Sequence, residues 1–299
     1  MLATHVPGGR TLALGLLGAA APLGLMAERL RREAGIRRAV ATTHGHEVWW
    51  ARTPGVRALL RRIGDRTDAV TYLGAATRAP IAAALGPAAR RMVRLAPGVD
   101  PQAFHVRDGH PEIRERYGLG ARPVILCAAR LVPRNGQDTP IRALPAVRRA
   151  VPGAALLLSG DGPCARTPRR LAEGTGAAGH VIFAGGQPHA EMPGHYAAAD
   201  VLAMPCRTRR RGGIVFLEEA AAGLPVLVGD SGGAPDAVRD GETGHVVDGR
   251  DVEAVADRLV GLLRDREAAA AMGEKGRAWV REAWGWGSAY ATLEGLLRP

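Results

Sequence analysis

The second half of the sequence predicts an α/β fold in which helices cover both faces of a parallel sheet. Short, continuous apolar runs recur there at 123–128, 154–159, 181–184, 201–204, 225–229 and 245–247. Helix-like segments separate most of these runs, and in the first segment Ile141, Leu144 and Val147 recur at helical spacing. Strands without polar alternation are buried on both faces, and their alternation with helices is typical of parallel sheets.

The first 120 residues predict fewer strands. Segment 40–50 predicts a strand followed by a polar turn, 68–74 a second strand and 92–100 a third. Residues 11–26 form an apolar run after Arg10, but the run is shorter than the roughly 20 residues of a bilayer span. No small-residue cleavage site follows it, so we expect an internal buried helix rather than a signal peptide. These strands are too few for a complete doubly wound domain.

A polar, turn-rich stretch at 107–123 separates the two regions. A chain of 299 residues exceeds the length at which one core usually splits, so two domains are expected. We place the first domain at 1–118, the second at 119–283 and a C-terminal segment at 284–299. Within that last segment, Ser288 is expected to cap the start of a short amphipathic helix.

The composition indicates an ordinary globular protein with an excess of positive charge. Hydrophobic residues make up 46% and charged residues 23%, and the net charge is +11. Lys275 is the only lysine, so the excess reflects either a coding bias toward arginine or an anionic partner. Nucleotide phosphates and an anionic membrane surface both fit. Aromatics are only 4% and do not interleave with basic stretches, so we expect no nucleic-acid partner.

The three cysteines, Cys127, Cys164 and Cys206, show no metal-site spacing. We interpret them as reduced thiols of a cytoplasmic protein. Cys127 lies inside an apolar run, which predicts a small core residue.

Ligands of open parallel sheets bind at the carboxyl ends of the strands, so the loops that follow the apolar runs are the first candidates. The turn ARLVPRNGQD at 129–138 places Arg130 directly after a predicted strand, with Arg134 and the neutral Asn135 nearby. A guanidinium at a strand end can hold two phosphate oxygens at once; the alternative is a surface arginine. Gly160 and Arg207 lie in the corresponding loops after 154–159 and 201–204.

The segment GGIVFLEEAAAGLP predicts a helix that begins at about Ile214 after Gly213 and ends before Gly223. A helix start of this kind presents free backbone N–H groups and the positive end of the dipole, which suits a phosphate. Glu218 lies one turn into the helix, where a carboxylate can accept hydrogen bonds from two sugar hydroxyls. The alternative is that Glu218 only complements the helix dipole.

The motif THGHE at 43–47 follows the first strand of the amino-terminal region. His44 at the strand end can hydrogen-bond a substrate hydroxyl or a phosphate; the alternative is an ordinary loop histidine. His44, His46 and Glu47 do not have the spacing of a helical metal site, so we expect no metal.

The ordered motifs resemble the family-4 retaining glycosyltransferases of the GT-B fold, in which two Rossmann-like domains face a cleft. The motifs are HGHEV, APGVDPQAF, ARLVPRNGQD, GDGP, AADVLAMPCRTR, GIVFLEEAAAGLPVLVGDSGGAPDAV and GETGHVVDG. Within the family, the chain is most similar to actinobacterial GDP-mannose-dependent phosphatidylinositol mannosyltransferases, the branch that adds the second mannose. The resemblance covers roughly residues 18–297 and is less specific for the sugar, so a UDP-sugar-dependent relative remains an alternative.

The resemblance implies a donor site in the second domain. Arg130 would hold the diphosphate with Arg134, Asn135, Gly160 and Arg207 nearby. The backbone N–H groups of Gly213, Ile214 and Val215 would meet the phosphates, and Glu218 would bind the ribose.

The resemblance also implies that His44, together with Arg130, is catalytic and approaches the mannose from the first domain. Arginine, lysine and the helix end would neutralise the leaving diphosphate, so no metal cofactor is expected. The final helix, after Trp284 and Trp286, would pack back on the first domain. The partners would be a nucleotide sugar, a lipid or glycolipid acceptor and the anionic inner face of the plasma membrane, where the protein would be peripheral.

Three departures from the family pattern predict reduced activity. Asn135 stands where the family has a lysine, a loss for which Arg134 could partly compensate, and Arg210 stands where it has the first of two glutamates. The family's amino-terminal strand and glycine-rich loop have no counterpart, so we expect a truncated first domain. A degenerate homologue with little or no activity therefore remains an alternative.

Overall fold

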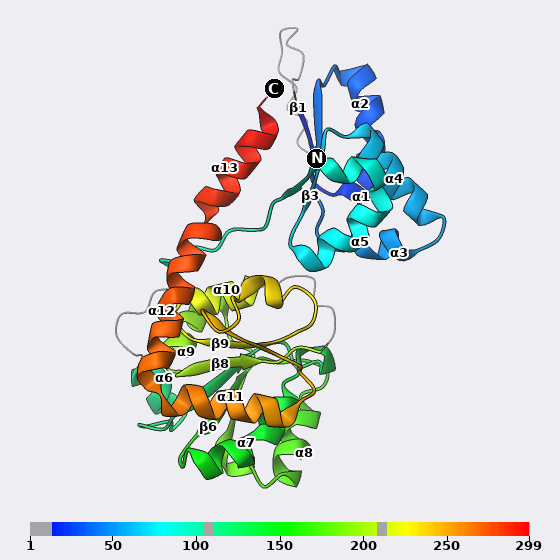
Figure 1. Ribbon diagram of the computed structural model, residues 1–299. Coiled ribbons are helices and arrows are strands. Elements are labelled where there is room, and N and C mark those ends of the chain that lie inside the picture. Colours follow the sequence, from blue (N-terminus) through cyan, green and yellow to red (C-terminus); the bar gives the residue numbers. More distant parts are fainter. Residues whose placement is uncertain (1–13, 105–110, 208–213, 299) are drawn as a thin grey trace. The chain divides into compact units, whose positions relative to one another are not determined.

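The computed structural model describes residues 14–104, 111–207 and 214–298, which divide into two compact units (Figure 1). The first unit comprises the chain through Gly98 together with the segment from Trp286, and the second comprises Val99–Gly285. Among the described residues, no helix combines the length and apolarity needed to cross a bilayer.

The second unit contains a six-stranded sheet in which all pairs are parallel, in the order β10-β9-β8-β5-β6-β7. The strands are β5 (Val124–Ala128), β6 (Ala155–Ser159), β7 (Val181–Gly185), β8 (Val201–Met204), β9 (Val226–Gly229) and β10 (Gly244–Val247). Each agrees with a predicted apolar run to within one residue. Every residue of β5, β6, β8 and β9 is buried, which confirms strands that are covered on both faces.

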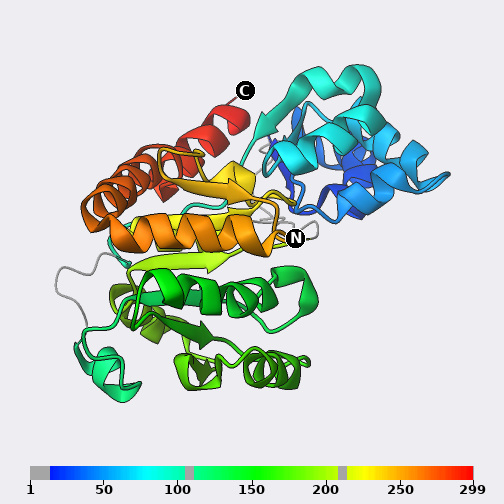
Figure 2. The ribbon, with the colours of Figure 1, turned by 60° about the horizontal axis from the view of Figure 1, so that its bottom comes forward.

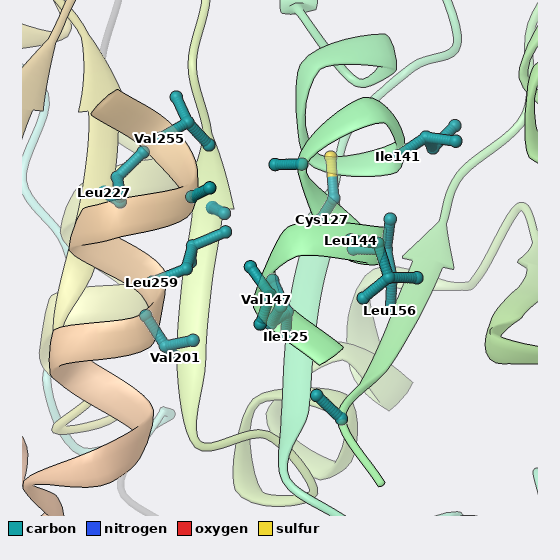
Figure 3. Close-up of a cluster of buried hydrophobic side chains, with 14 of the residues drawn as sticks. Ile125, Cys127, Ile141, Leu144, Val147, Leu156, Val201, Leu227, Val255 and Leu259 are labelled. Carbon is teal, nitrogen blue, oxygen red and sulfur yellow. The ribbon is translucent and has the colours of Figure 1, made fainter. Parts of the chain in front are cut away.

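Helices cover both faces of this sheet. They are α6 (Pro111–Arg116), α7 (Asp138–Ala150), α8 (Arg166–Gly174), α9 (Met192–Ala197), α10 (Ile214–Ala221), α11 (Val252–Arg264) and α12 (Arg266–Ala283). Helices α7 and α11 lie side by side (Figures 1 and 2), while α10 contacts α12 and lies on the other side of β8 and β9. Figure 3 shows the core between α7, α11 and the sheet, where Ile141, Leu144 and Leu259 meet Ile125 and the predicted core residue Cys127.

The first unit contains a four-stranded parallel sheet in the order β1-β2-β3-β4. Its strands are β1 (Leu14–Leu17), β2 (Arg38–Ala41), β3 (Ala69–Tyr72) and β4 (Met92–Arg94). Its helices are α1 (Ala20–Leu23), α2 (Ala27–Ala34), α3 (Glu47–Arg52), α4 (Val56–Arg66), α5 (Ala75–Leu85) and α13 (Trp286–Leu297). The end of α13 packs on this sheet, because Leu296 lies against Val40 and Ala69. Arg38 also donates a hydrogen bond of 2.8 Å to the Arg298 carbonyl oxygen.

The structure corrects the prediction of one helix over 11–26. Leu14–Leu17 is a strand that pairs with β2, and a kinked helix begins only at Ala20; residues 11–13 lie outside the described part. The periodicity of a short run of Leu, Ala and Gly does not distinguish a strand from a buried helix. The segment forms a strand because it pairs with β2.

Two further boundaries in the first unit differ from the prediction. The polar turn expected in 40–50 is followed at once by α3, whose first residue, Glu47, is buried. The C-terminal helix begins at Trp286, so Ser288 lies inside it and does not cap it. Trp286 packs closely on Gly98, where an added Cβ would lie 2.6 Å from the Trp286 Cα. This contact fixes the backbone at the helix start.

The division into units falls earlier than the boundary placed at 118/119. The stretch expected to be a linker contains α6, whose Ile113 is buried. Arg114 pairs with Asp200 at 3.3 Å, and the Tyr117 hydroxyl lies 3.3 Å from His195 Nε2. These contacts attach α6 to the second unit.

Candidate functional site

The loops after β5 and β8 pack backbone to backbone at the carboxyl edge of the second unit's sheet. The Arg207 N–H donates to the Arg134 carbonyl oxygen at 3.1 Å. Gly136 has a φ of 73° and lies so close to the β8 loop that an added Cβ would be 1.9 Å from the Pro205 carbonyl oxygen. Only glycine satisfies both conditions, so Gly136 fixes the path of the turn.

The loop after β6 is attached to the same turn. The Leu131 N–H donates to the Asp161 carbonyl oxygen at 2.9 Å. Gly160 has a φ of 154°, and a Cβ there would lie 2.0 Å from the Ala129 carbonyl oxygen. The structure therefore brings the predicted Gly160 beside the strand end that carries Arg130.

Arg130 and Arg134 are both exposed on this edge. Neither guanidinium forms a hydrogen bond or an ion pair with any described residue. Two unpaired guanidinium groups on a turn fixed by glycine are suited to an anion, because a phosphate can accept paired hydrogen bonds from each.

Asn135 was expected beside the donor diphosphate, but its side chain is buried within the turn. Its side chain is only 3% exposed, and its Nδ2 donates to the Arg130 carbonyl oxygen at 2.7 Å. Its Oδ1 is buried and has no partner among the described residues. Asn135 is therefore a support of the Arg130 turn. The effect of this neutral residue on donor binding stays a prediction.

We expect Asn135→Ala to lower the free energy of unfolding by about 0.5–1.5 kcal/mol, because it removes one of the two donors to the Arg130 carbonyl oxygen and leaves only the Val132 N–H, at 2.9 Å. Urea denaturation followed by circular dichroism measures this effect. Arg134→Ala removes an exposed neighbouring side chain and should change the stability by less than about 0.5 kcal/mol. Equal stability of wild type and Asn135→Ala would contradict this role.

Arg207 is bound by protein groups on three sides. Its Nε donates to the Gly249 carbonyl oxygen at 2.9 Å, and one Nη lies 2.9 Å from the Asp138 carboxylate and also contacts Thr139 Oγ1. Its side chain is 22% exposed. Arg207 thus ties together the loops after β5, β8 and β10, and its predicted contact with the donor stays a prediction.

Glu218 on α10 lies in an aromatic cluster. It is half-buried, and the buried Tyr196 hydroxyl hydrogen-bonds its carboxylate. The Phe104 ring lies 6.0 Å from the Tyr196 ring and meets His189 edge-on at 5.6 Å. Burial raises the pKa of Glu218, and His189 and the Tyr196 hydrogen bond lower it. Burial, followed by the charges of Glu219 and Glu218, raises the pKa of Tyr196, so this hydroxyl remains a donor.

Tyr196→Phe should weaken nucleotide binding most strongly at acidic pH. If Glu218 must be ionised to accept the ribose hydroxyls, affinity falls as the pH drops through its pKa. The Tyr196 hydrogen bond lowers that pKa. Without this bond the fall should begin at a higher pH. Calorimetric titration of GDP between about pH 5 and 8 measures the shift.

The matched control for this titration is Tyr117→Phe, which removes a hydroxyl that contacts His195 in the same unit. The control should follow the wild-type pH profile. If Tyr196→Phe also gave a profile parallel to the wild type, the role of Tyr196 in positioning Glu218 would be wrong.

His44 belongs to the first unit and follows β2. It is exposed, and its Nε2 lies 2.6 Å from the Gly18 carbonyl oxygen. A carbonyl only accepts, so Nε2 carries the hydrogen and Nδ1 is left as an acceptor. The His44 N–H donates to Glu47 Oε2 at 3.0 Å, and the other oxygen of this fully buried carboxylate lies 3.2 Å from His46 Nε2. Glu47 therefore anchors the turn that presents His44.

Two of the remaining predicted residues lie at the start of α10. Ile214 is its first residue and Val215 its second, while Gly213 and Arg210 lie outside the described residues. Within the described ranges, no three His, Cys, Asp or Glu side chains gather as a metal site requires.

Sequence reasoning missed Glu47 and Tyr196 as supporting residues. The spacing of Glu47, three residues after His44, offered a signal, because a carboxylate there can reach back to a turn N–H. Tyr196 offered none, since its partner Glu218 is distant in the sequence and only the folded chain joins them.

Two units that each contain a parallel sheet with helices around it match the GT-B class of fold. Solved structures with the same fold include Anabaena Alr3699/HepE in complex with UDP, with a TM-score of 0.81 and 19% identity, covering 94% of this chain and 77% of that one. A glycosyltransferase from Rickettsia africae ESF-5 has a TM-score of 0.77 and 16% identity, covering 95% of this chain and 76% of that one.

Residues 110–279 match the family model of the group 1 glycosyl transferases, and the chain belongs to this family. It is 52% identical, over 94% of its length and 74% of the relative's, to the GDP-mannose-dependent alpha-(1-6)-phosphatidylinositol monomannoside mannosyltransferase of Mycobacterium tuberculosis. It is 44% identical, over 90% of its length and 72% of the relative's, to the GDP-mannose-dependent monoacylated alpha-(1-6)-phosphatidylinositol monomannoside mannosyltransferase of Corynebacterium glutamicum. The resemblance seen in the motifs is confirmed, and the chain is a glycosyltransferase.

Proposed function

We propose that this glycosyltransferase moves mannose from GDP-mannose to a phosphatidylinositol mannoside-type lipid, with retention of the anomeric configuration. The observation that carries the proposal is the 52% identity over 94% of the chain to a mannosyltransferase named for that donor and acceptor. The unpaired arginines at the strand edge support it, because they offer a place for the donor diphosphate.

In this proposal the second unit binds the nucleotide. Arg130 pairs with the diphosphate, and the N–H groups at the start of α10, at Ile214 and Val215, face the same oxygens. Negative charge develops on GDP as the sugar departs, and fixed cationic and N–H groups stabilise it without a metal. Glu218 accepts hydrogen bonds from the ribose hydroxyls.

The role proposed for the first unit is to meet the sugar and the acceptor. The free Nδ1 of His44 accepts a hydrogen bond from a hydroxyl of the transferred mannose. Glu47 holds the turn in place while this bond forms, because it binds the His44 N–H in a buried position.

Calorimetry with GDP and UDP tests the donor assignment. We expect GDP to bind at least about tenfold more tightly than UDP, a difference of about 1.4 kcal/mol. The Arg130→Ala variant should bind both diphosphates weakly. Tighter binding of UDP would support the UDP-sugar alternative, and binding of neither would support a degenerate homologue.

We also propose that the first unit associates with an anionic membrane surface. The net charge of +11 is unevenly divided: the first unit holds 16 arginines against six carboxylates, and the second holds 24 basic residues against 23. Helix α4 exposes Arg57, Arg61 and Arg62, and the neighbouring α3 exposes Trp49. Each basic residue near an anionic surface contributes about 1 kcal/mol.

Sedimentation with vesicles tests this association. Binding to vesicles that contain phosphatidylinositol should exceed binding to neutral vesicles and should fall with added salt. Reversing Arg61 and Arg62 to glutamate should weaken binding, whereas the same reversal at the exposed Arg166 and Arg170 of the second unit should not. Equal binding to neutral and anionic vesicles would contradict the proposal.

A further inference from the structure

The first unit carries a pocket of about 490 Å³ at the carboxyl ends of its strands. The ends of β2, β3 and β4 form one side. The other side is a stripe of α13 made by Trp286, Ala289, Tyr290 and Leu293, which recur at helical spacing. This volume lies in the range of pockets that hold small ligands, and every lining residue belongs to the first unit.

The polar side chains along this pocket are largely satisfied by the protein itself. Thr42 Oγ1 donates to a backbone carbonyl at 3.0 Å, and Thr43 Oγ1 donates to the Thr71 carbonyl oxygen at 2.7 Å. Thr71 Oγ1 accepts from the Thr43 N–H at 3.2 Å, and His44 Nε2 bonds to a carbonyl. A ligand inside therefore finds few hydrogen-bond partners beyond His44 Nδ1, so its enclosed part must be apolar.

The start of α13 presents apolar surface to solvent, although its end is anchored in the core. Trp286 is 60% exposed and Tyr290 is 68% exposed, whereas Leu296 is buried against Val40 and Ala69. Exposed aromatic side chains beside an apolar hollow are typical of ligand sites.

The charge of the first unit indicates which apolar ligand fits. This unit carries nearly the whole positive excess of the chain, so it complements an apolar molecule with an anionic head. A phospholipid has both parts. Trp and Tyr are suited to the boundary between hydrocarbon and a polar head, because one end of each ring is apolar and the other can hydrogen-bond.

We propose that this pocket encloses part of a hydrocarbon chain of the acceptor phospholipid, with Trp286 and Tyr290 covering it and the headgroup beginning near His44. This inference rests on the proposed function, since the lipid is the acceptor of that reaction. It adds a binding site for the acyl chain, so the enzyme distinguishes the intact lipid from its headgroup.

The test compares kcat/KM for two acceptors: a short-chain phosphatidylinositol mannoside below its micelle concentration, and the same molecule after removal of its acyl chains. Ala289→Phe fills the pocket, and Tyr290→Ala removes part of its wall from an exposed position. Each should lower kcat/KM for the lipid by about tenfold and change it by less than about twofold for the deacylated acceptor. The matched control, Ala291→Phe, adds the same ring at an exposed position of α13 outside the pocket and should leave both values unchanged.

Equal losses on both acceptors would overturn the proposal, because the pocket would then serve the headgroup or the fold. Unchanged values for both pocket variants would overturn it as well.

A direct binding experiment separates this inference from the proposed reaction. A brominated short-chain phosphatidylinositol should quench tryptophan fluorescence in the wild type and in Ala291→Phe, but much less in Ala289→Phe. This result would support the pocket even if the wild type transferred no mannose, in which case the proposed function alone would fail. Equal quenching in all three proteins, or none in the wild type, would refute the acyl-chain site.

Discussion

Replacing Arg130 with alanine is expected to reduce kcat/KM for mannosyl transfer from GDP-mannose by at least about 100-fold. A charged hydrogen bond contributes about 1.5–3 kcal/mol, and a guanidinium can make two of them to a diphosphate. The contribution should be largest as GDP departs, because the negative charge is then greatest, so kcat should fall as well as donor affinity. Steady-state kinetics with radiolabelled GDP-mannose measure both parameters.

The folded state should survive this substitution, since Arg130 is exposed and makes no side-chain bond to any described residue. Arg149→Ala is the matched control. It removes an exposed arginine from the far end of α7, away from the carboxyl edge of the sheet, and should leave the kinetics unchanged. A loss of less than about threefold for Arg130→Ala would contradict its place at the diphosphate.

Glu218→Gln should raise the KM for GDP-mannose by about 10- to 100-fold and change kcat little. The ribose is distant from the reacting bond, so its hydrogen bonds are equal in the ground state and the transition state. Loss of two charge-assisted bonds, replaced by weaker amide contacts, accounts for the magnitude. Kinetics at saturating acceptor separate KM from kcat.

Glutamine keeps the size of the half-buried Glu218 side chain, so the cluster with Tyr196 should remain packed. Glu173→Gln, an exposed change of the same kind on α8, should leave the KM unchanged. A fall in kcat with a constant KM would show that Glu218 acts on the reacting groups and not on the ribose.

The sheet of the second unit could be predicted because its strands are buried on both faces. Such strands are continuous apolar runs, and β5 and β6 began and ended within one residue of their predicted bounds. The first unit was harder to predict. Its strand Leu14–Leu17 lies in a run of Leu, Ala and Gly, where a strand and a helix have the same composition.

Some site residues could be placed from the sequence pattern, and others could be placed only from the packing of the folded chain. Arg130 could be placed at a strand end because the strand itself was clear. Asn135 could not be placed, because only packing shows that its side chain turns inward and holds the Arg130 carbonyl. That the loss of the family's lysine at Asn135 weakens donor binding stays a prediction, because the position of an amide does not show where a longer side chain would reach. The contacts of Arg207 could not be predicted either, because its partners Asp138 and Gly249 are distant from it in the sequence.

The concentration of charge in the first unit follows from the sequence once the division at 98/99 and 285/286 is known. Before folding, Arg298 at the carboxyl end and the arginines of the amino-terminal region could not be assigned to the same unit. The fold shows that the excess of arginine belongs to the first unit, so we expect this unit to contact an anionic partner.

Product analysis after incubation of the protein with GDP-mannose and phosphatidylinositol monomannoside tests the central claim most directly. Mass spectrometry and proton magnetic resonance of the purified lipid should show one added hexose, joined in the anomeric configuration of the donor. UDP-sugars should give no product, and Arg130→Ala should give almost none. An unchanged lipid at stoichiometric enzyme, or a product of inverted configuration, would contradict the account.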